Sequence, residues 1–175
     1  MPAAAAPVLL PDAGPLITLA YAGQLDLLLR PGWPLRLVDM VLHEVTRNAT
    51  PTRDAIAAFT ARHQVAVIET QTLRKHLRQP GGVQAGAPRK AGLGELATQE
   101  AINQLALSQP PQPAVLLFED HKIARASFHL PQGTLRVSTR AFLSFLEEKG
   151  WLDSAAEVER QAVQAGRRFS QLRFP

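Results

Sequence analysis

Short apolar strands alternate with amphipathic helices along this chain, and no other feature constrains its fold as strongly. The expected strands are three to six residues long, are mostly apolar, and lie near residues 8–10, 35–38, 65–70, 114–118 and 135–139. Helical spacing of apolar residues separates them. Because strands joined through helices pair in parallel, we expect an α/β fold of three layers (α/β/α) around a central, mostly parallel sheet.

The length of 175 residues and the 46% hydrophobic content fit one domain with a core of its own. We find no internal repeat. Residues 78–92 are basic and rich in glycine and proline, which predicts a mobile loop. Residues 154–175 form the C-terminal tail, in which a last amphipathic helix is expected.

Composition excludes several kinds of site. The chain has no cysteine, so disulfides, cysteine-ligated zinc, iron–sulfur clusters and a thiol nucleophile are excluded. No run of 18 apolar residues predicts a membrane span, and the first residues lack the basic start of a signal peptide, so we expect a cytoplasmic protein. The net charge of +4 hints at an anionic partner such as nucleic acid.

Acidic residues follow two of the predicted strands. Asp12 comes after the first strand, and Glu119 and Asp120 come after the strand at 114–118. Glu44 and Glu95 belong to helices that follow loops at the same edge of the sheet, where α/β proteins bind ligands. Carboxylate oxygens suit Mg²⁺ or Mn²⁺, and such ions activate water and stabilise displacement at phosphorus.

Each acid also has a purely structural interpretation. Asp12 is equally well placed to cap the following helix. Glu44 suits a solvated helix face, Glu119 and Asp120 suit a turn, and Glu95 suits the dipole of a helix start. Only their joint placement at strand ends favours a functional site.

Two acids compete for one position on the helix at 94–108. Glu95 and Glu100 project about 140° apart around a helix, so they cannot serve the same site. Glu95 lies nearer the start of the helix and is our first choice, with Glu100 as the second.

The ordered set of motifs resembles a known family. The segments are VLLPDAGPLITLAYAGQLDLL, VLHEV, GLGELATQEAINQLAL, AVLLFEDHKIARA, VSTRAFLSFLEEKGWLD and QAGRRFS. Together they resemble PIN domains, the fold of VapC-type toxin ribonucleases, and in particular the stand-alone prokaryotic VapC-like branch. The resemblance spans nearly the whole chain, although no single motif is specific by itself.

The resemblance implies a role for individual residues. In chain order, the four metal-site acids match Asp12, Glu44, Glu95 and Asp120, with Glu119 beside the last and Thr139 as the hydroxyl residue before a late helix. The chain departs from the family where Glu119 replaces an aspartate and where Ser138 and Ala141 replace glycines.

The function implied by the resemblance is an Mg²⁺- or Mn²⁺-dependent endoribonuclease that hydrolyses RNA phosphodiester bonds. The family also implies an antitoxin partner and a homodimer. Basic residues near the site that suit RNA contacts are Lys122, Arg125, Arg89 and Lys90, although each also suits a solvated surface. The alternative is a PIN-fold module with a degraded site that binds RNA or protein without cleaving it. The chain has neither a Gly-x-Ser-x-Gly motif nor a Walker motif, so the sequence does not indicate a different class of hydrolase.

Overall fold

The computed structural model describes residues 5–78, 92–119 and 130–168 and confirms the expected α/β class. The strands are β1 (Val8–Pro11), β2 (Arg36–Val38), β3 (Ala66–Ile68), β4 (Ala114–Phe118) and β5 (Thr134–Ser138). The helices are α1 (Ala13–Tyr21), the 3₁₀ helix η1 (Leu25–Leu29), α2 (Asp39–Thr46), α3 (Arg53–Arg62), α4 (Gln71–Arg78), α5 (Leu93–Ala106), α7 (Thr139–Glu148) and α8 (Ala155–Gln164).

The described strands pair in parallel throughout. A three-stranded sheet has the order β1-β4-β5, and β2 pairs with β3 beside it. The amide of Leu9 in β1 donates to the carbonyl of Pro34 at 2.8 Å, and Leu9 and Leu35 form a parallel bridge. The strands therefore follow the spatial order β3, β2, β1, β4, β5.

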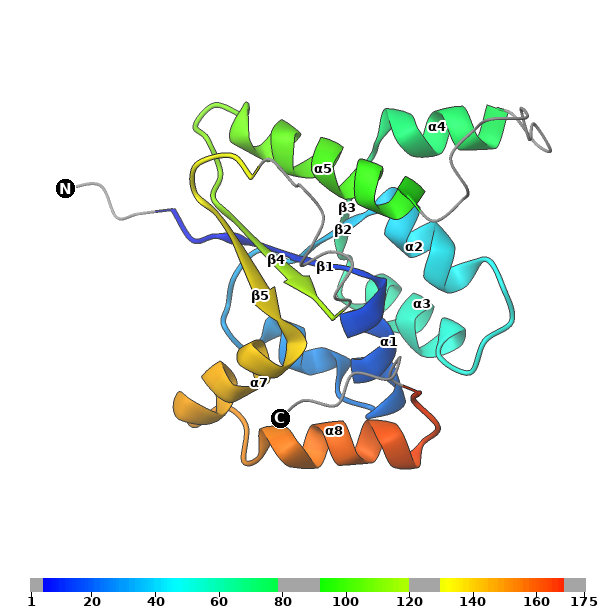
Figure 1. Ribbon diagram of the computed structural model, residues 1–175, viewed down its shortest axis with the longest axis vertical. Coiled ribbons are helices and arrows are strands. Elements are labelled where there is room, and N and C mark those ends of the chain that lie inside the picture. Colours follow the sequence, from blue (N-terminus) through cyan, green and yellow to red (C-terminus); the bar gives the residue numbers. More distant parts are fainter. Residues whose placement is uncertain (1–4, 79–91, 120–129, 169–175) are drawn as a thin grey trace.

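This order contains a reversal between β1 and β4. The chain moves outward through β2 and β3 and then returns across β1 to form β4. Helices lie on both sides of the sheet, with α4 and α5 at the top of Figure 1 and α7 and α8 at the bottom. At such a reversal the connections from the two neighbouring strands run in opposite directions, and α/β proteins bind ligands near the carboxyl ends of these strands.

The core explains why these strands form. β1 and β4 read VLLP and AVLLF, and both are buried on their two faces, as central parallel strands require. The largest fully buried side chains include Phe59 of α3 and Phe142 of α7, which come from helices packed around the sheet. In the described part of the chain, no helix has the length and apolarity needed to cross a membrane.

Helix α4 was absent from the sequence predictions. Its sequence, QTLRKHLR, has only two apolar residues, Leu73 and Leu77, and none is fully buried, although Leu73 packs against the core. An apolar stripe of two residues is too short to indicate a helix from the sequence. The strand expected at 65–70 was wrong beyond Ile68, because Thr70 already begins the approach to α4. Most of the predicted loop at 78–92 and the helix expected near 123–130 lie outside the described residues.

The start of α7 also differs from its prediction. The last strand ends at Ser138, and Thr139 is the first residue of the helix. The hydroxyl of Ser138 accepts a hydrogen bond from the amide of Ala141 at 3.1 Å, which is the bond of an N-terminal cap. The sequence placed this boundary one residue later.

Candidate functional site at the sheet edge

Asp12 lies at the reversal between β1 and β4. Its amide donates to the carbonyl of Leu117 at 2.9 Å, so the end of β1 is tied to the end of β4. Asp12 holds the cap position of α1 in extended conformation, yet its side chain makes no capping hydrogen bond. Asp12 therefore lies at the strand end where the sequence analysis expected it, but its carboxylate does not cap α1.

Glu119 follows β4 and lies against the start of α1. A side chain at Gly14 would bring a Cβ within 2.8 Å of the Cβ of Glu119, so only glycine permits this close approach. The Oε2 atom of Glu119 accepts hydrogen bonds from Thr18 Oγ1 at 2.9 Å and from Arg167 Nη2 at 2.7 Å. The charge of Glu119 is thus balanced within the protein, from the far end of the chain.

Glu44 approaches the start of α5. The helix α2 packs against α5, and a Cβ at Gly94 would lie 3.2 Å from Oε2 of Glu44. Glu95 follows Gly94 in the first turn of α5. Burial raises the pKa of Glu44, and the charge of Arg47 opposes this shift only in part. The packing therefore brings a half-buried, poorly compensated carboxylate close to the residue that precedes Glu95.

Glu100 has a different role. Its Oε1 atom accepts from the amide of Gln71 at 2.6 Å, and its Oε2 atom accepts from the amide and hydroxyl of Thr72 at 3.2 and 3.1 Å. Burial by itself would raise the pKa of Glu100, but these hydrogen bonds outweigh it and lower the pKa. Glu100 thus satisfies the free amides at the start of α4.

Asp39 is an acid that the sequence analysis did not single out. Its Oδ2 atom accepts from the amide of Thr70 at 2.7 Å, and its Oδ1 atom accepts from the hydroxyl of Thr70 at 2.7 Å and the amide of Met40 at 2.7 Å. Asp39 begins α2 and fixes the residue before α4. A helix start in the sequence VDMVLHEV was the only available signal.

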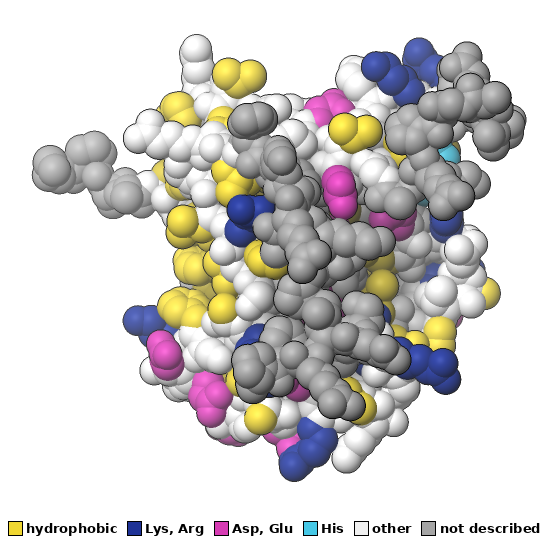
Figure 2. Space-filling model, viewed as in Figure 1, with side chains coloured by type: hydrophobic (Ala, Val, Ile, Leu, Met, Phe, Trp, Pro, Cys, Tyr) yellow, Lys and Arg dark blue, Asp and Glu magenta, His cyan; other side chains and the backbone are white. Residues whose placement is uncertain are grey.

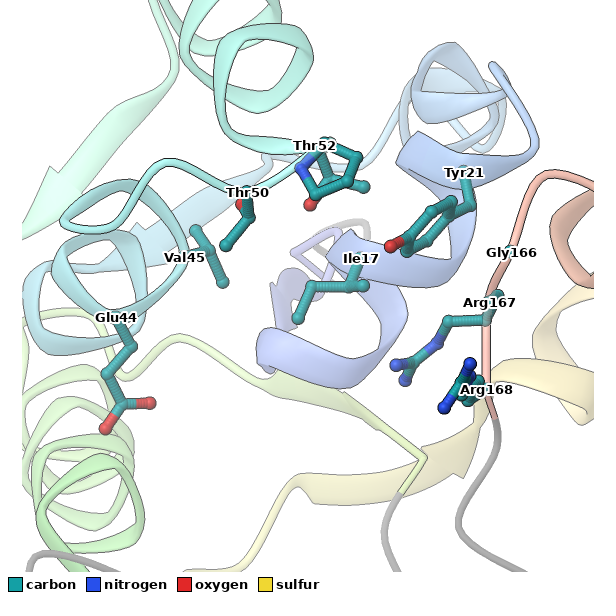
Figure 3. A pocket seen from close by; sticks show the side chains of 10 residues that line it. Ile17, Tyr21, Glu44, Val45, Thr50, Thr52, Gly166, Arg167 and Arg168 are labelled. Carbon is teal, nitrogen blue, oxygen red and sulfur yellow. The ribbon is translucent and has the colours of Figure 1, made fainter.

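A cavity of about 390 Å³ opens beside α1. The lining side chains come from α1, from α2 and the segment that follows it, and from the C-terminal segment (Figure 3): Ile17, Tyr21, Glu44, Val45, Thr50, Pro51, Thr52, Gly166, Arg167 and Arg168. Its volume lies within the range of small-molecule sites. Glu44 and the arginines lie at opposite sides of it in Figure 3.

The remaining expected residues divide into two groups. Thr139 is buried, and its hydroxyl lies 3.4 Å from the carbonyl oxygen of Phe118, where it joins the start of α7 to the end of β4. Asp120, Lys122, Arg125, Arg89 and Lys90 fall outside the described residues. Within residues 5–78, 92–119 and 130–168, no three acidic or histidine side chains are grouped closely enough to hold a metal ion.

Charged side chains of both signs lie on the surface. In Figure 2, basic side chains lie at the upper right, near the end of α4, whereas acidic and basic side chains are mixed over the lower part of this face. Helices α7 and α8 carry ion pairs between Arg140 and Glu159 and between Arg160 and Glu157. The last turn of α4 supplies Lys75, His76 and Arg78. The end of α4 is thus a basic part of a surface that is otherwise mixed in charge.

No family model, curated protein or solved structure matches the chain.

Proposed function

We propose that this protein is a metal-dependent endoribonuclease of the PIN type, which hydrolyses phosphodiester bonds of RNA. The observation that carries the proposal is the position of Asp12 at the reversal between β1 and β4, the place where α/β sheets of this topology bind ligands. The strand order and the ordered motifs quoted above support the same class.

The residues fit a hard divalent cation by their chemistry. Asp12, Glu44 and Glu95 supply carboxylate oxygens, and Asp120 would be the fourth by the family resemblance. Once bound, Mg²⁺ or Mn²⁺ supplies a Lewis acid that activates water and stabilises charge at phosphorus. The raised pKa of Glu44 is in keeping with this role, because burial leaves its negative charge short of a partner.

The basic side chains supply the other half of the function. Lys75 and Arg78 of α4 attract the RNA backbone, and Lys122, Arg125, Arg89 and Lys90 are proposed to extend this contact. Glu100 and Asp39 contribute indirectly by holding α4 in place.

The proposed function also implies binding partners and a location in the cell. A toxin of this type acts in the cytoplasm, pairs with an antitoxin that covers the acidic site, and forms a homodimer. These three statements follow from the resemblance and are tested separately by co-purification with a neighbouring gene product and by light scattering.

Cleavage of a fluorescent single-stranded RNA tests the proposal. We expect cleavage with Mg²⁺ or Mn²⁺, none with EDTA, and a loss of at least about 100-fold in Asp12→Asn. Asp54→Asn is the matched control, since the Asp54 side chain is 98% exposed, and it should cleave like the wild type. Full metal-dependent cleavage by Asp12→Asn would refute the assignment.

If the protein binds RNA but does not cleave it with any added divalent metal ion, the alternative function, a PIN-fold binding module, is favoured. Calorimetry with Mn²⁺ separates the two cases. The nuclease binds the ion, and the degraded module does not.

A further inference from the structure

The C-terminal segment that follows α8 turns back across α1. Gly166 has a φ of +107°, a conformation that residues with a side chain rarely adopt. The amide of Arg167 then donates to the carbonyl of Ala162 at 2.9 Å, and the segment runs beside Tyr21. A glycine turn thus directs two consecutive arginines toward the cavity beside α1.

Arg167 anchors this segment at the sheet edge. Its Nε donates to Thr18 Oγ1 at 2.8 Å and its Nη2 donates to Glu119 Oε2 at 2.7 Å. The Arg167 and Glu119 side chains are only 20% and 14% exposed. Charge-assisted hydrogen bonds in such a shielded place are stronger than those of surface pairs. Arg167 therefore behaves as a fixed joint between α8, α1 and β4.

Arg168 differs from its neighbour. It is exposed and lines the cavity, and within the described part of the chain it forms no ion pair. Because the charge of Arg167 is balanced by Glu119, Arg168 carries the excess positive charge at this side of the cavity. Across the cavity lie the Thr50 and Thr52 side chains and, in Figure 3, the hydroxyl end of Tyr21 projects into the space between Ile17 and Arg167.

We propose that this cavity binds one nucleotide unit of the RNA, with its phosphate at Arg168, and that Arg167 is a positioning residue that holds the cavity wall through Glu119 and Thr18. The inference rests on the proposed function. It predicts that the RNA runs through the cavity from Arg168 past Tyr21 toward Glu44. A cation, hydroxyl groups and an aromatic ring beside apolar side chains are the groups that recognise phosphate, sugar and base.

The proposal also reassigns Glu119. The resemblance put it beside the fourth metal-site acid, whereas its contacts make it the anchor of the C-terminal segment. The test must therefore separate an effect on the cavity from an effect on the metal.

An NMR titration with adenosine 5′-monophosphate in EDTA makes this separation, because it requires neither metal nor cleavage. We expect shifts of the Tyr21, Thr50 and Arg168 amides, and binding about tenfold weaker in Arg168→Gln. Arg74→Gln is the matched control, since Arg74 pairs with Glu69 at the surface of α4, and it should bind like the wild type. No binding by the wild type, or equal binding by Arg168→Gln, would overturn the proposal.

Other ligands define which part of the nucleotide matters. Adenosine and inorganic phosphate should each bind more weakly than the nucleotide. Equal binding of adenosine would overturn the phosphate contact, and tighter binding of a hexaglutamate peptide would indicate a protein ligand instead.

A double-mutant cycle tests the positioning role. We expect Arg167→Gln and Glu119→Gln each to weaken nucleotide binding and to speed hydrogen exchange at the Arg167 amide, and the double variant to lose little more than either. Arg167→Lys should restore part of the affinity. Additive losses would contradict action through Glu119. Nuclease activity that survives while nucleotide binding fails would refute this inference and leave the proposed function standing.

Discussion

The acids near one edge of the sheet divide into two regions with opposite environments. Around α4, Asp39 and Glu100 accept backbone amide hydrogen bonds, and the bonds to Glu100 lower its pKa against the opposing effect of its partial burial. Around the start of α5, Glu44 is half-buried with its pKa raised. The comparison teaches that an acid which caps a helix has its charge stabilised by the fold, whereas an acid held without such donors suits an external cation.

The largest expected difference between the two regions is in the rate of RNA cleavage. Glu95→Gln is expected to lower RNA cleavage by about 100-fold or more, because it removes a proposed metal ligand. Glu100→Gln, on the same helix, should stay within about threefold of the wild type. Initial cleavage rates at saturating Mn²⁺ measure both, and the reverse order would exchange the roles of the two acids.

For the free energy of unfolding we expect the opposite order, with the larger loss at Glu100 and the smaller loss at Glu95. Glu100→Ala leaves the first amides of α4 without their acceptor and should lower the free energy of unfolding by about 1–2 kcal/mol. Glu95→Ala should change it by less than about 0.5 kcal/mol. Urea unfolding of the two variants measures these changes. Equal losses of unfolding free energy in Glu100→Ala and Glu95→Ala would contradict the expected difference.

The pH dependence gives a smaller effect with opposite signs. The raised pKa of Glu44 costs stability as pH rises above 4.5 through its folded value, so Glu44→Gln should melt about 1–2 °C higher than the wild type at neutral pH. The lowered pKa of Glu100 contributes stability above 4.5 that is lost as pH falls through its folded value, so Glu100→Gln should melt lower at neutral pH.

The Glu44 difference should shrink as pH falls below 4.5, and the Glu100 difference should shrink only as pH falls through its own lowered folded value. Thermal melts of the three proteins across this range provide the measurement. A destabilised Glu44→Gln at neutral pH would show that the Glu44 carboxylate serves the fold.

The sequence predicted the strands well where burial alone determines them. The VLLP and AVLLF runs have no polar residue and are buried in the sheet, so their position follows from composition. The carboxyl-edge rule then located Asp12 without further information. The prediction of a three-layer α/β fold rests on these same segments.

Contacts across long sequence separations were not predictable. Helix α4 depends on Glu100 for its first turn, 28 and 29 residues away from its partners Thr72 and Gln71. Glu119 meets Arg167 across 48 residues and Thr18 across 101. No local pattern encodes such pairs, and for that reason the sequence could not distinguish the structural acids from the candidate ligands.

Calorimetric titration with Mn²⁺ tests the division of the two regions most directly. We predict that the wild type and Glu100→Gln bind the ion with affinities within about threefold, while Glu44→Gln binds at least about tenfold more weakly. Equal affinities for all three proteins, or a loss confined to Glu100→Gln, would contradict the account.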